Sequence, residues 1–312
     1  MKDDPLVSII ITTYKRADNL DRAIVSALQQ TYRNIEIIVV DDNGVGSFYQ
    51  KTTEQSVENY VSLKEIKYIA REYNGGGGEA RNTGIELSQG EYITFLDDDD
   101  EYLDDKVEKQ VRFLEKGYDI CLSSMIVRKE NGEEIFPNWS YARGNSVKDF
   151  ILNGNSYTPM IMARTDLIKK VGGFDSVKML QDHIFMLKML RSFPRLISIK
   201  DKLYVHNIHS NERVSKKKSI DCYLLKQSME NEFISILNFS EKKSLKFKHS
   251  KELALLYSEK NEYSKSIKTS LDSLRFVCNF HLMKEFVKLM LRVSVGPRGY
   301  NIIEKIKEKN HA

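Results

Sequence analysis

The amino-terminal half of this chain alternates short apolar runs with segments of helical periodicity, and this order restricts the fold more than any other feature. Residues 6–12, LVSIIIT, are β-branched and apolar without alternation, which is typical of a strand buried on both faces of a parallel sheet. Residues 20–30 then place apolar side chains at helical spacing, and residues 34–40, NIEIIVV, return to the strand pattern. Further strands are expected at 66–70 and 91–96, and further helices at 52–61 and 80–88. This order predicts an α/β fold with a doubly wound, mostly parallel sheet flanked by helices.

Beyond residue 100 the pattern becomes mixed and then purely helical. Residues 120–129 and 134–136 are expected to form antiparallel strands around the Asn131-Gly132 turn. From about residue 216 onward only helices are expected, and residues 254–267 resemble one tetratricopeptide-like helical hairpin without a second copy. The sequence therefore predicts an α/β domain over residues 1–215 and a basic helical region over residues 216–312. Other expected elements are helices at 104–116, 146–152, 166–171 and 182–192, a strand at 159–163 and an extended segment at 196–206.

Charge is distributed unevenly along the 312 residues. Residues 1–199 hold 25 Lys and Arg against 31 Asp and Glu, whereas residues 200–312 hold 23 against 13, a net charge of +10. Such a region is either a solvated helical surface or a face toward an anionic partner such as a membrane, and both remain open. No stretch approaches the roughly 20 apolar residues of a spanning helix. The first residues do not resemble a signal region and three scattered cysteines fit a reducing compartment, so we expect a cytoplasmic protein.

Polar clusters follow three of the expected strands, at the points where the strands end. Residues 12–16 follow the first strand, Asp41 and Asp42 end the second, and four consecutive aspartates at 97–100 follow the fourth. Because the carboxyl ends of parallel strands meet at one edge of a sheet, we expect these clusters to line a common cleft. Four adjacent carboxylates call for a cation, and their hard oxygens suit Mg²⁺ or Mn²⁺. An EF-hand is excluded because Tyr102 stands where that loop needs glycine.

These clusters belong to a longer, ordered set of motifs. The segments VSIIITTYKR at 7–16, IIVVDDN at 37–43 and GEYITFLDDDD at 90–100 occur together with a loop from Asn74 to Gly84. Gly-Gly-Phe-Asp at 172–175 and the pair Gln181-Asp182 follow later. Over roughly residues 6–215 this set resembles the large family 2 of GT-A glycosyltransferases. The resemblance implies a GT-A-like, Rossmann-like fold, a nucleotide-diphosphate sugar as donor, a divalent metal and inversion at the anomeric carbon.

The resemblance also implies roles for individual residues. The family's Asp-x-Asp motif maps to residues 97–99, which places Asp97 at the ribose and Asp99 on the metal, although the additional Asp98 leaves the register ambiguous by one residue. His209 would complete the metal shell or touch the diphosphate. The residues expected to line the nucleotide are Thr12, Tyr14, Arg16, Asp41, Asp42, Asn74, Arg81, Asp97 and Asp98.

The general base follows from the chemistry that the resemblance implies. Inverting transfer needs a carboxylate that takes the proton of the acceptor hydroxyl as this oxygen attacks. In the family this base is the Asp of a Glu-Asp pair at the head of a helix, and Asp182 occupies that position here. Gln181 replaces the glutamate and removes one negative charge. Asp182 would also suit the structural role of a helix N-cap.

The resulting prediction is an inverting, metal-dependent glycosyltransferase with a UDP-sugar as the expected donor. The expected acceptor is a hydroxyl of a glycan, free or lipid-linked, in cell-surface or capsular polysaccharide synthesis. Peripheral contact with the inner face of the cell membrane through the basic helices is a further hypothesis. One alternative is a sugar nucleotidyltransferase, but this class would need a glycine-rich loop where the chain has Thr-Thr-Tyr-Lys-Arg. A second alternative, suggested by Gln181, is a non-catalytic sugar-nucleotide-binding protein. We expect no nucleic-acid partner, because the basic region lacks interleaved aromatic residues.

Overall fold

The computed structural model describes residues 4–208 and 219–309, the segment 297–309 as backbone only. The chain forms two units, residues 1–213 and 214–312. All strands of the described residues lie in the first unit, and the described part of the second unit is built from helices.

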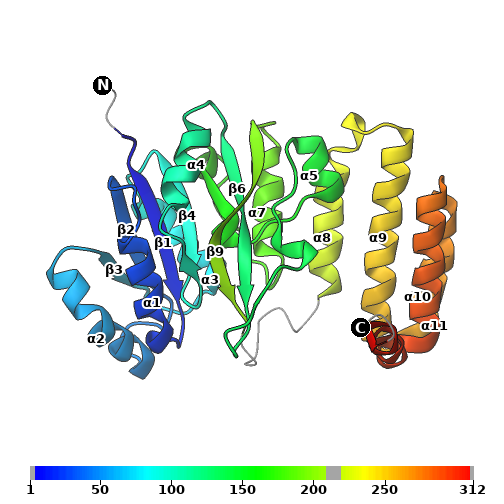
Figure 1. Cartoon of the computed structure of the whole chain (residues 1–312), viewed down its shortest axis with the longest axis horizontal. Helices are drawn as coiled ribbons and strands as arrows, with labels where there is room; N and C mark the ends of the chain where they lie inside the picture. Colours follow the sequence, from blue (N-terminus) through cyan, green and yellow to red (C-terminus); the bar gives the residue numbers. More distant parts are fainter. Residues whose placement is uncertain (1–3, 209–218, 310–312) are drawn as a thin grey trace. The chain divides into compact units, whose positions relative to one another are not determined.

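Nine strands form one mixed sheet in the order β3-β2-β1-β4-β8-β6-β9-β5, with β7 paired to β6 (Figure 1). Its parallel part consists of β1 (Val7–Thr13), β2 (Ile35–Asp41), β3 (Lys67–Ala70) and β4 (Tyr92–Asp97). β8 is antiparallel to both β4 and β6, whereas β9 is parallel to β6 and antiparallel to β5. The remaining strands are β5 (Glu101–Tyr102), β6 (Ile120–Arg128), β7 (Glu134–Ile135), β8 (Ile161–Arg164) and β9 (Leu196–Asn207). The predicted α/β fold with a mixed sheet is confirmed, and so is the antiparallel pairing of β6 with β7.

The central strand β1 is buried on both faces, as its unbroken apolar run predicts. Ile9, Ile10 and Ile11 are all 0% exposed. Ile9 and Ile11 pack in a cluster with side chains of α1 (Ala17–Leu28) and α4 (Lys106–Leu114). Ile10 faces the opposite side, where a Cβ built on Gly84 of α3 (Gly77–Leu87) would lie 2.5 Å from Ile10 Cγ2. The absence of a side chain at Gly84 therefore permits the close packing of α3 on the sheet.

The other helices of the first unit complete the two layers around the sheet. Val57 of α2 (Phe48–Ser62) joins the cluster formed with α1 and α4. On the α3 side, Phe95 of β4 contacts the rings of Phe174 and of Phe185 in α7 (Gln181–Leu190), at centroid distances of 5.3 and 6.0 Å. Two short helices, α5 (Val147–Asn153) and α6 (Thr165–Lys170), lie in the connections that precede α7.

Two helices begin earlier than the sequence pattern predicts. α2 begins at Phe48 because Ser47 caps it, with Ser47 Oγ accepting from Gln50 N at 3.1 Å. α3 begins at Gly77, three residues before the expected start at residue 80, after Gly76 with φ of +85°. The two-residue strand β5 is absent from the sequence prediction.

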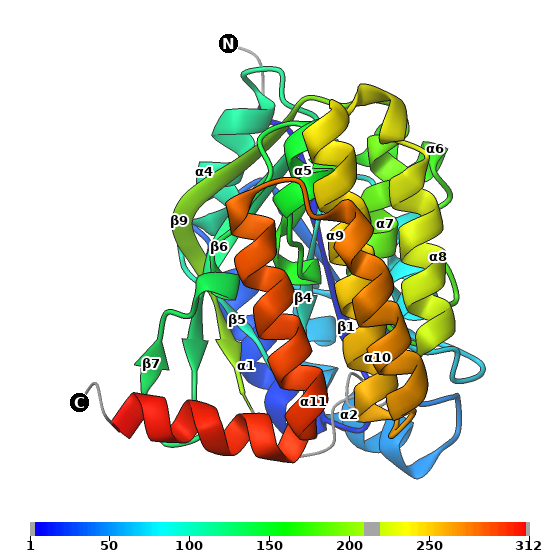
Figure 2. The same cartoon turned by 90° about the vertical axis from the view of Figure 1, so that its right-hand side faces the viewer.

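The second unit consists of α8 (Ile220–Asn231), α9 (Phe239–Glu259), α10 (Tyr263–Asp272) and α11 (Phe280–Lys309), which is kinked at Gly296. Asn238 and Glu241 form a capping box at the start of α9. α9 and α10 form the expected helical hairpin, and α11 packs against both (Figure 2). Glu230 of α8 is 0% exposed and accepts from Lys248 Nζ at 3.0 Å. None of the described helices combines the length and apolarity that crossing a bilayer requires.

Candidate active site

The carboxyl ends of β1, β2 and β4 bring the predicted polar clusters together at one edge of the sheet. Thr12 of β1 pairs with Asp97 of β4, and Thr13 pairs with Asp41 of β2. Thr13 Oγ1 also donates to Asp98 Oδ2 at 2.8 Å. The adjacency follows from parallel pairing, because neighbouring parallel strands end at the same edge.

Asp98 and Asp99 share a basic partner from the turn after β1. Arg16 Nη1 donates to Asp98 Oδ1 at 3.2 Å and to Asp99 Oδ2 at 2.5 Å. Tyr14 N and the Thr13 hydroxyl also donate to Asp98. Burial raises the pKa of Asp98 to about 7, and Arg16 opposes this shift. Asp98 is therefore held inside the protein by the β1 turn, whereas the side chain of Asp99 keeps 17% of its surface exposed.

Asp97 and Asp100 have basic partners elsewhere in the fold. Arg81 Nη2 of α3 donates to Asp97 Oδ1 at 2.6 Å. His206 Nδ1 of β9 lies 3.1 Å from each carboxylate oxygen of Asp100, and Asn207 N donates to Asp100 Oδ1 at 3.1 Å. Burial raises the pKa of Asp100, and the neighbouring His206 opposes the shift. The negative charge of the four acids, which we call the acid tetrad, is thus balanced in part by the chain's own basic side chains.

The donor set of the acid tetrad fits a divalent ion that shares its coordination shell with a substrate. Asp97 and Asp99 offer hard carboxylate oxygens on side chains that are 32% and 17% exposed. Within residues 4–208 and 219–309, no three or more His, Cys, Asp or Glu side chains are grouped as a metal cage. Mg²⁺ usually binds through one or two carboxylates, substrate phosphates and water, so two carboxylates are enough for such an ion. His209, the further predicted ligand, lies outside the described residues.

Asp42 organises the glycine loop before α3. Its Oδ1 accepts from Arg71 Nη1 at 2.6 Å and from Gly75 N at 3.0 Å. Its Oδ2 accepts from Asn74 Nδ2 at 2.9 Å and from Gly76 N at 2.7 Å. Four donors therefore hold this buried carboxylate, and they bring the predicted Asn74 to the end of β2.

Asp41, one residue earlier, is also paired within the protein. Tyr68 Oη donates to Asp41 Oδ2 at 2.8 Å, and Asn43 N donates to Oδ1 at 2.8 Å. Burial raises the pKa of the Asp41 carboxyl. Asp41 is 0% exposed, so a nucleotide base can reach this carboxylate only if neighbouring side chains move.

The turn after β1 places an aromatic ring at the surface of the same edge. Tyr14 is 43% exposed. Lys15 has φ of +59°, a conformation that is rare for residues other than glycine. Lys15 N donates to Asn43 Oδ1 at 2.9 Å, which fixes the turn against the end of β2.

Arg81 links the acid tetrad to the start of α7. Besides its bond to Asp97, Arg81 Nη1 donates to Gln181 Oε1 at 3.3 Å. The Arg81 guanidinium lies 5.4 Å from the centre of the Phe174 ring. Burial raises the pKa of Asp182. To a smaller extent, the positive charge of Arg81 lowers this pKa and the negative charge of Asp97 raises it. The fold therefore places Gln181, the residue before the predicted general base, against Arg81, which also binds Asp97.

Asp182 lies within the first turn of α7 and is not its N-cap. The cap position belongs to Leu180, which has φ of +60° and makes no side-chain capping bond. Asp182 Oδ1 accepts from His183 N at 2.8 Å. A left-handed conformation at a non-glycine residue costs roughly 1–3 kcal/mol and is frequent beside functional groups.

The loop that leads to α7 is fixed by Asn82 of α3. Asn82 Oδ1 accepts from Phe174 N at 2.8 Å, and Asn82 Nδ2 donates to Phe174 O at 2.9 Å. Gly173 has φ of +63°, and a Cβ at this position would lie 2.2 Å from Asn82 Oδ1. Glycine is therefore required where the Gly-Gly-Phe-Asp motif passes α3.

Three residues that contact the predicted ones do not belong to the predicted site. Arg71 follows directly after β3 and pairs with Asp42. The same strand-end argument that found Asp41 would have found it. His206 and Asn207 contact Asp100 from the last strand, across more than a hundred residues of sequence, and no local signal marks that pairing.

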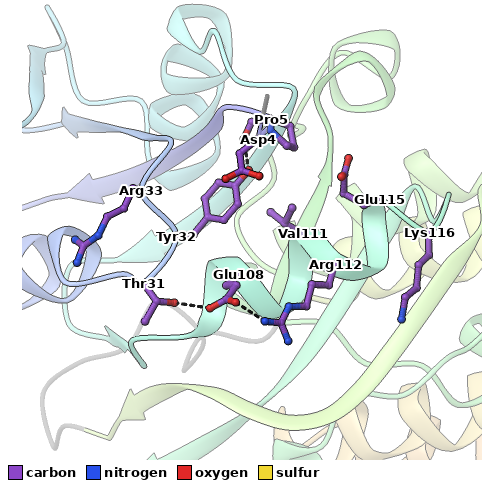
Figure 3. Close-up of a pocket in the computed structure, with 10 residues that line it drawn as sticks. All are labelled: Asp4, Pro5, Thr31, Tyr32, Arg33, Glu108, Val111, Arg112, Glu115 and Lys116. Atoms are coloured by element: carbon purple, nitrogen blue, oxygen red, sulfur yellow. Dashed lines mark hydrogen bonds and ion pairs between the residues drawn. The ribbon is translucent and has the colours of Figure 1, made fainter. Parts of the chain in front are cut away.

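A separate pocket of about 610 Å³ lies near the amino ends of β1 and β2 (Figure 3). It is lined by residues before β1, by the segment between α1 and β2, and by α4 and the turn after it. Thr31 Oγ1 donates to Glu108, which also pairs with Arg112 one turn later on α4. None of the predicted site residues lines it.

Comparison of the sequence with known families agrees with this geometry. The family model described as "Glycosyl transferase family 2" matches residues 8–172. An uncharacterized glycosyltransferase of Haemophilus influenzae is 31% identical over 229 residues, which cover 68% of this chain and 80% of the relative. The Escherichia coli protein WfaP, named as a UDP-Glc:α-D-GlcNAc-diphosphoundecaprenol β-1,3-glucosyltransferase, is 32% identical over 154 residues, 49% of this chain and 52% of that protein.

Solved structures show the same fold. The crystal structure of S. aureus TarS 1–349 in complex with UDP-GlcNAc has a TM-score of 0.66 and 22% sequence identity, and the match covers 87% of this chain and 81% of that chain. The UDP complex of the same protein has a TM-score of 0.57 at 20% identity, over 91% and 78% of the two chains. With the strand-end acids, the order of motifs and the family match in agreement, this chain is a glycosyltransferase and belongs to glycosyl transferase family 2.

Proposed function

We propose that this glycosyltransferase moves a sugar from a UDP-sugar to a hydroxyl group of a glycan, with inversion at the anomeric carbon. The observation that supports the proposal is that Arg81 contacts both Asp97, at the end of β4, and Gln181, the residue before Asp182. WfaP is named for a UDP-glucose donor, and the TarS structures contain UDP-GlcNAc or UDP, which supports a uridine nucleotide here.

The donor side of the site is assigned to the ends of β1, β2 and β4. Thr12, Tyr14 and Arg16 would line the nucleotide, and Arg81 would offer its guanidinium to the diphosphate. The loop that Asp42 holds in place, with Asn74 at its start, would border the base. Asp99 would hold a Mn²⁺ or Mg²⁺ ion, which when bound supplies positive charge to the departing diphosphate, and Asp97 would contact the ribose.

Asp182 is assigned the proton transfer. In the reaction, the acceptor oxygen forms a bond to the anomeric carbon while the bond from that carbon to the diphosphate breaks on the opposite face. The proton of the acceptor hydroxyl passes to the Asp182 carboxylate, and the bonding electrons leave with UDP. Burial raises the pKa of Asp182, which makes this carboxylate a stronger base than an exposed aspartate.

Release of UDP from a panel of UDP-, GDP- and dTDP-sugars with Mn²⁺ tests the proposal. The expected result is turnover of one UDP-sugar, which falls by about 10²–10⁴-fold in Asp182→Asn. Asp166→Asn is a matched control, because Asp166 also lies in the first turn of a helix and accepts from the following backbone N at 2.8 Å. Equal turnover of wild type and Asp182→Asn would remove Asp182 from its role. Binding of a UDP-sugar without turnover would favour a non-catalytic binding protein, as Gln181 in place of glutamate suggests.

A membrane-borne acceptor in surface or capsular polysaccharide synthesis is the finer part of the proposal. α11 is apolar on two opposite faces: Leu289 and Val293 pack in a core cluster, whereas Val287 and Leu291 are 49% and 58% exposed. Phe280 continues the exposed row. The basic residues Lys284, Lys288 and Arg292 recur along α11 beside this row. An exposed apolar row next to basic side chains fits the interface of an anionic bilayer.

Flotation of the full chain with phosphatidylglycerol-containing vesicles tests the membrane contact at the inner face of the cell membrane. Wild type should float with the vesicles, and the double variant Val287→Glu, Leu291→Glu should not. Leu63→Glu is the control, because Leu63 is 69% exposed in the first unit. Equal flotation of wild type and the double variant would contradict the assignment.

A further inference from the structure

Three aromatic rings gather beside the acid tetrad. Trp139, in the 3₁₀ turn η1 (Asn138–Ser140), lies 5.8 Å from Tyr157 and 6.4 Å from His206, measured between ring centroids. Tyr157 and His206 are 6.2 Å apart. We call these residues the aromatic trio. Because His206 also contacts Asp100, the trio borders the acid tetrad.

Trp139 is held in place although its side chain is 38% exposed. Asn155 Nδ2 donates to Trp139 O at 2.8 Å, and Asn155 forms a β-bridge with Arg143. Ala142 N of the same loop donates to Ser124 Oγ of β6 at 3.0 Å. The ring is thus presented by an anchored loop, and such preorganisation lowers the entropy cost of binding a ligand.

Polar atoms without partners belong to the two residues that directly precede Tyr157. Ser156 is 7% exposed, and among residues 4–208 and 219–309 its Oγ has no hydrogen-bond partner. Among the described residues, Asn155 Oδ1 also has no hydrogen-bond partner, although Asn155 Nδ2 donates to Trp139 O. Buried polar atoms are normally paired, so a ligand hydroxyl or a water that it carries would complete this arrangement. Aromatic walls with a few convergent polar groups are typical of small-molecule sites.

The position of the trio separates it from the donor side. Apart from Asp97 and Asp98 of the tetrad, the residues assigned to the nucleotide lie at β1, at β2 and between β3 and β4, whereas His206 belongs to β9 and Trp139 follows β7, which pairs with β6. The acid tetrad at the end of β4 lies between these two parts of the sheet order.

We propose that the aromatic trio is an acceptor subsite that binds a pyranose ring, with the apolar C–H face of the sugar on Trp139 and its hydroxyls toward Ser156 and Asn155. The proposal rests on the proposed function, because the bound ring would present its hydroxyl to Asp182. A pyranose combines an apolar face with a rim of hydroxyl groups, which is the chemistry that the trio and its polar neighbours offer.

Trp139 is the one tryptophan of the chain, so intrinsic fluorescence reports on this subsite directly. Full-length protein would be titrated with methyl glycosides of glucose, galactose and N-acetylglucosamine, and with glycerol as a polyol control. The expected result is a saturable emission change for at least one glycoside and none for glycerol. Emission that responds to no glycoside, or equally to glycerol, would overturn the proposal. This measurement needs no donor and is independent of whether UDP is released.

Steady-state kinetics then separate acceptor binding from folding. Trp139→Ala should raise the half-saturating concentration of the active glycoside about tenfold, which corresponds to about 1.4 kcal/mol. The KM for the UDP-sugar should stay unchanged, and Trp139→Phe should recover most of the affinity. Phe136→Ala is the control, since Phe136 is 48% exposed nearby and its ring faces Lys202. If Trp139→Ala lost affinity equally for donor and acceptor, or lost none for either, the proposal would be overturned.

Discussion

The substitution Asp42→Asn removes a charge and two hydrogen-bond acceptor positions from a buried carboxylate. The contacts of Asp42 indicate how much stability the protein should lose. Each carboxylate oxygen of Asp42 accepts two hydrogen bonds, from Arg71 and Gly75 at one oxygen and from Asn74 and Gly76 at the other. An amide accepts at one position only and points its N–H groups toward donors at the other, so two bonds are lost in either orientation. At roughly 1.5–3 kcal/mol for each bond to a charged group, Asp42→Asn should cost about 3–6 kcal/mol.

Thermal unfolding of the full chain measures this loss. We expect Asp42→Asn to lower the Tm by roughly 10 °C, because about 1 kcal/mol corresponds to a few degrees in a unit of this size. Glu72→Gln removes the same charge from an exposed residue next to Arg71 and should change stability by less than about 0.5 kcal/mol. In an Arg71→Met background the effect of Asp42→Asn should shrink, because its charged partner is gone. An unchanged Tm in Asp42→Asn would refute the reasoning.

Three further predictions follow from buried or strained groups and from the metal. Burial lowers the pKa of Lys106 to about 7 from an ordinary 10.5, so between these values the unfolded chain binds more protons and stability rises with pH. Between pH 7 and pH 10, the free energy of unfolding of wild type, measured in urea, should rise relative to that of Lys106→Met by about 2–4 kcal/mol. A difference between the two proteins that does not change with pH would contradict this prediction. Leu180→Val should destabilise the protein more than Leu180→Gly although valine keeps more side chain, because φ of +60° is tolerated by glycine; the reverse order of Tm would exclude strain at this residue. EDTA should abolish UDP release and added Mn²⁺ should restore it, whereas turnover that persists in EDTA would argue against a metal at Asp99.

The parallel part of the fold was predictable because its signal is local. Residues 7–13 and 35–41 are apolar on both faces, and only a strand covered by helices on two sides buries such a run. Other features depend on contacts between distant residues. The strand β5 has two residues and exists because Glu101 and Tyr102 pair with β9, about a hundred residues later. The start of α2 depends on the Ser47 cap, which the apolar pattern does not register.

The candidate site shows the same division between local and distant information. The rule that polar residues at parallel strand ends share one edge found Asp41, Asp42 and residues 97–100. It did not indicate that Arg16 binds Asp99 across 83 positions, so the tetrad was interpreted as an acid cluster without protein partners. Trp139 went unnoticed because it belongs to no motif, and it becomes informative only when the sheet brings His206 beside it.

The central claim is that the strand-end acids bind the diphosphate of a sugar nucleotide beside Asp182. Calorimetric titration of the full chain with UDP in the presence of Mn²⁺ tests this most directly. We predict saturable one-to-one binding that weakens at least about tenfold, or about 1.4 kcal/mol, in Asp97→Asn and Asp99→Asn. The affinity of Asp182→Asn should stay close to that of wild type, because Asp182 acts on the acceptor. Absence of UDP binding to wild type, or equal affinity in the Asp97 and Asp99 variants, would contradict the account.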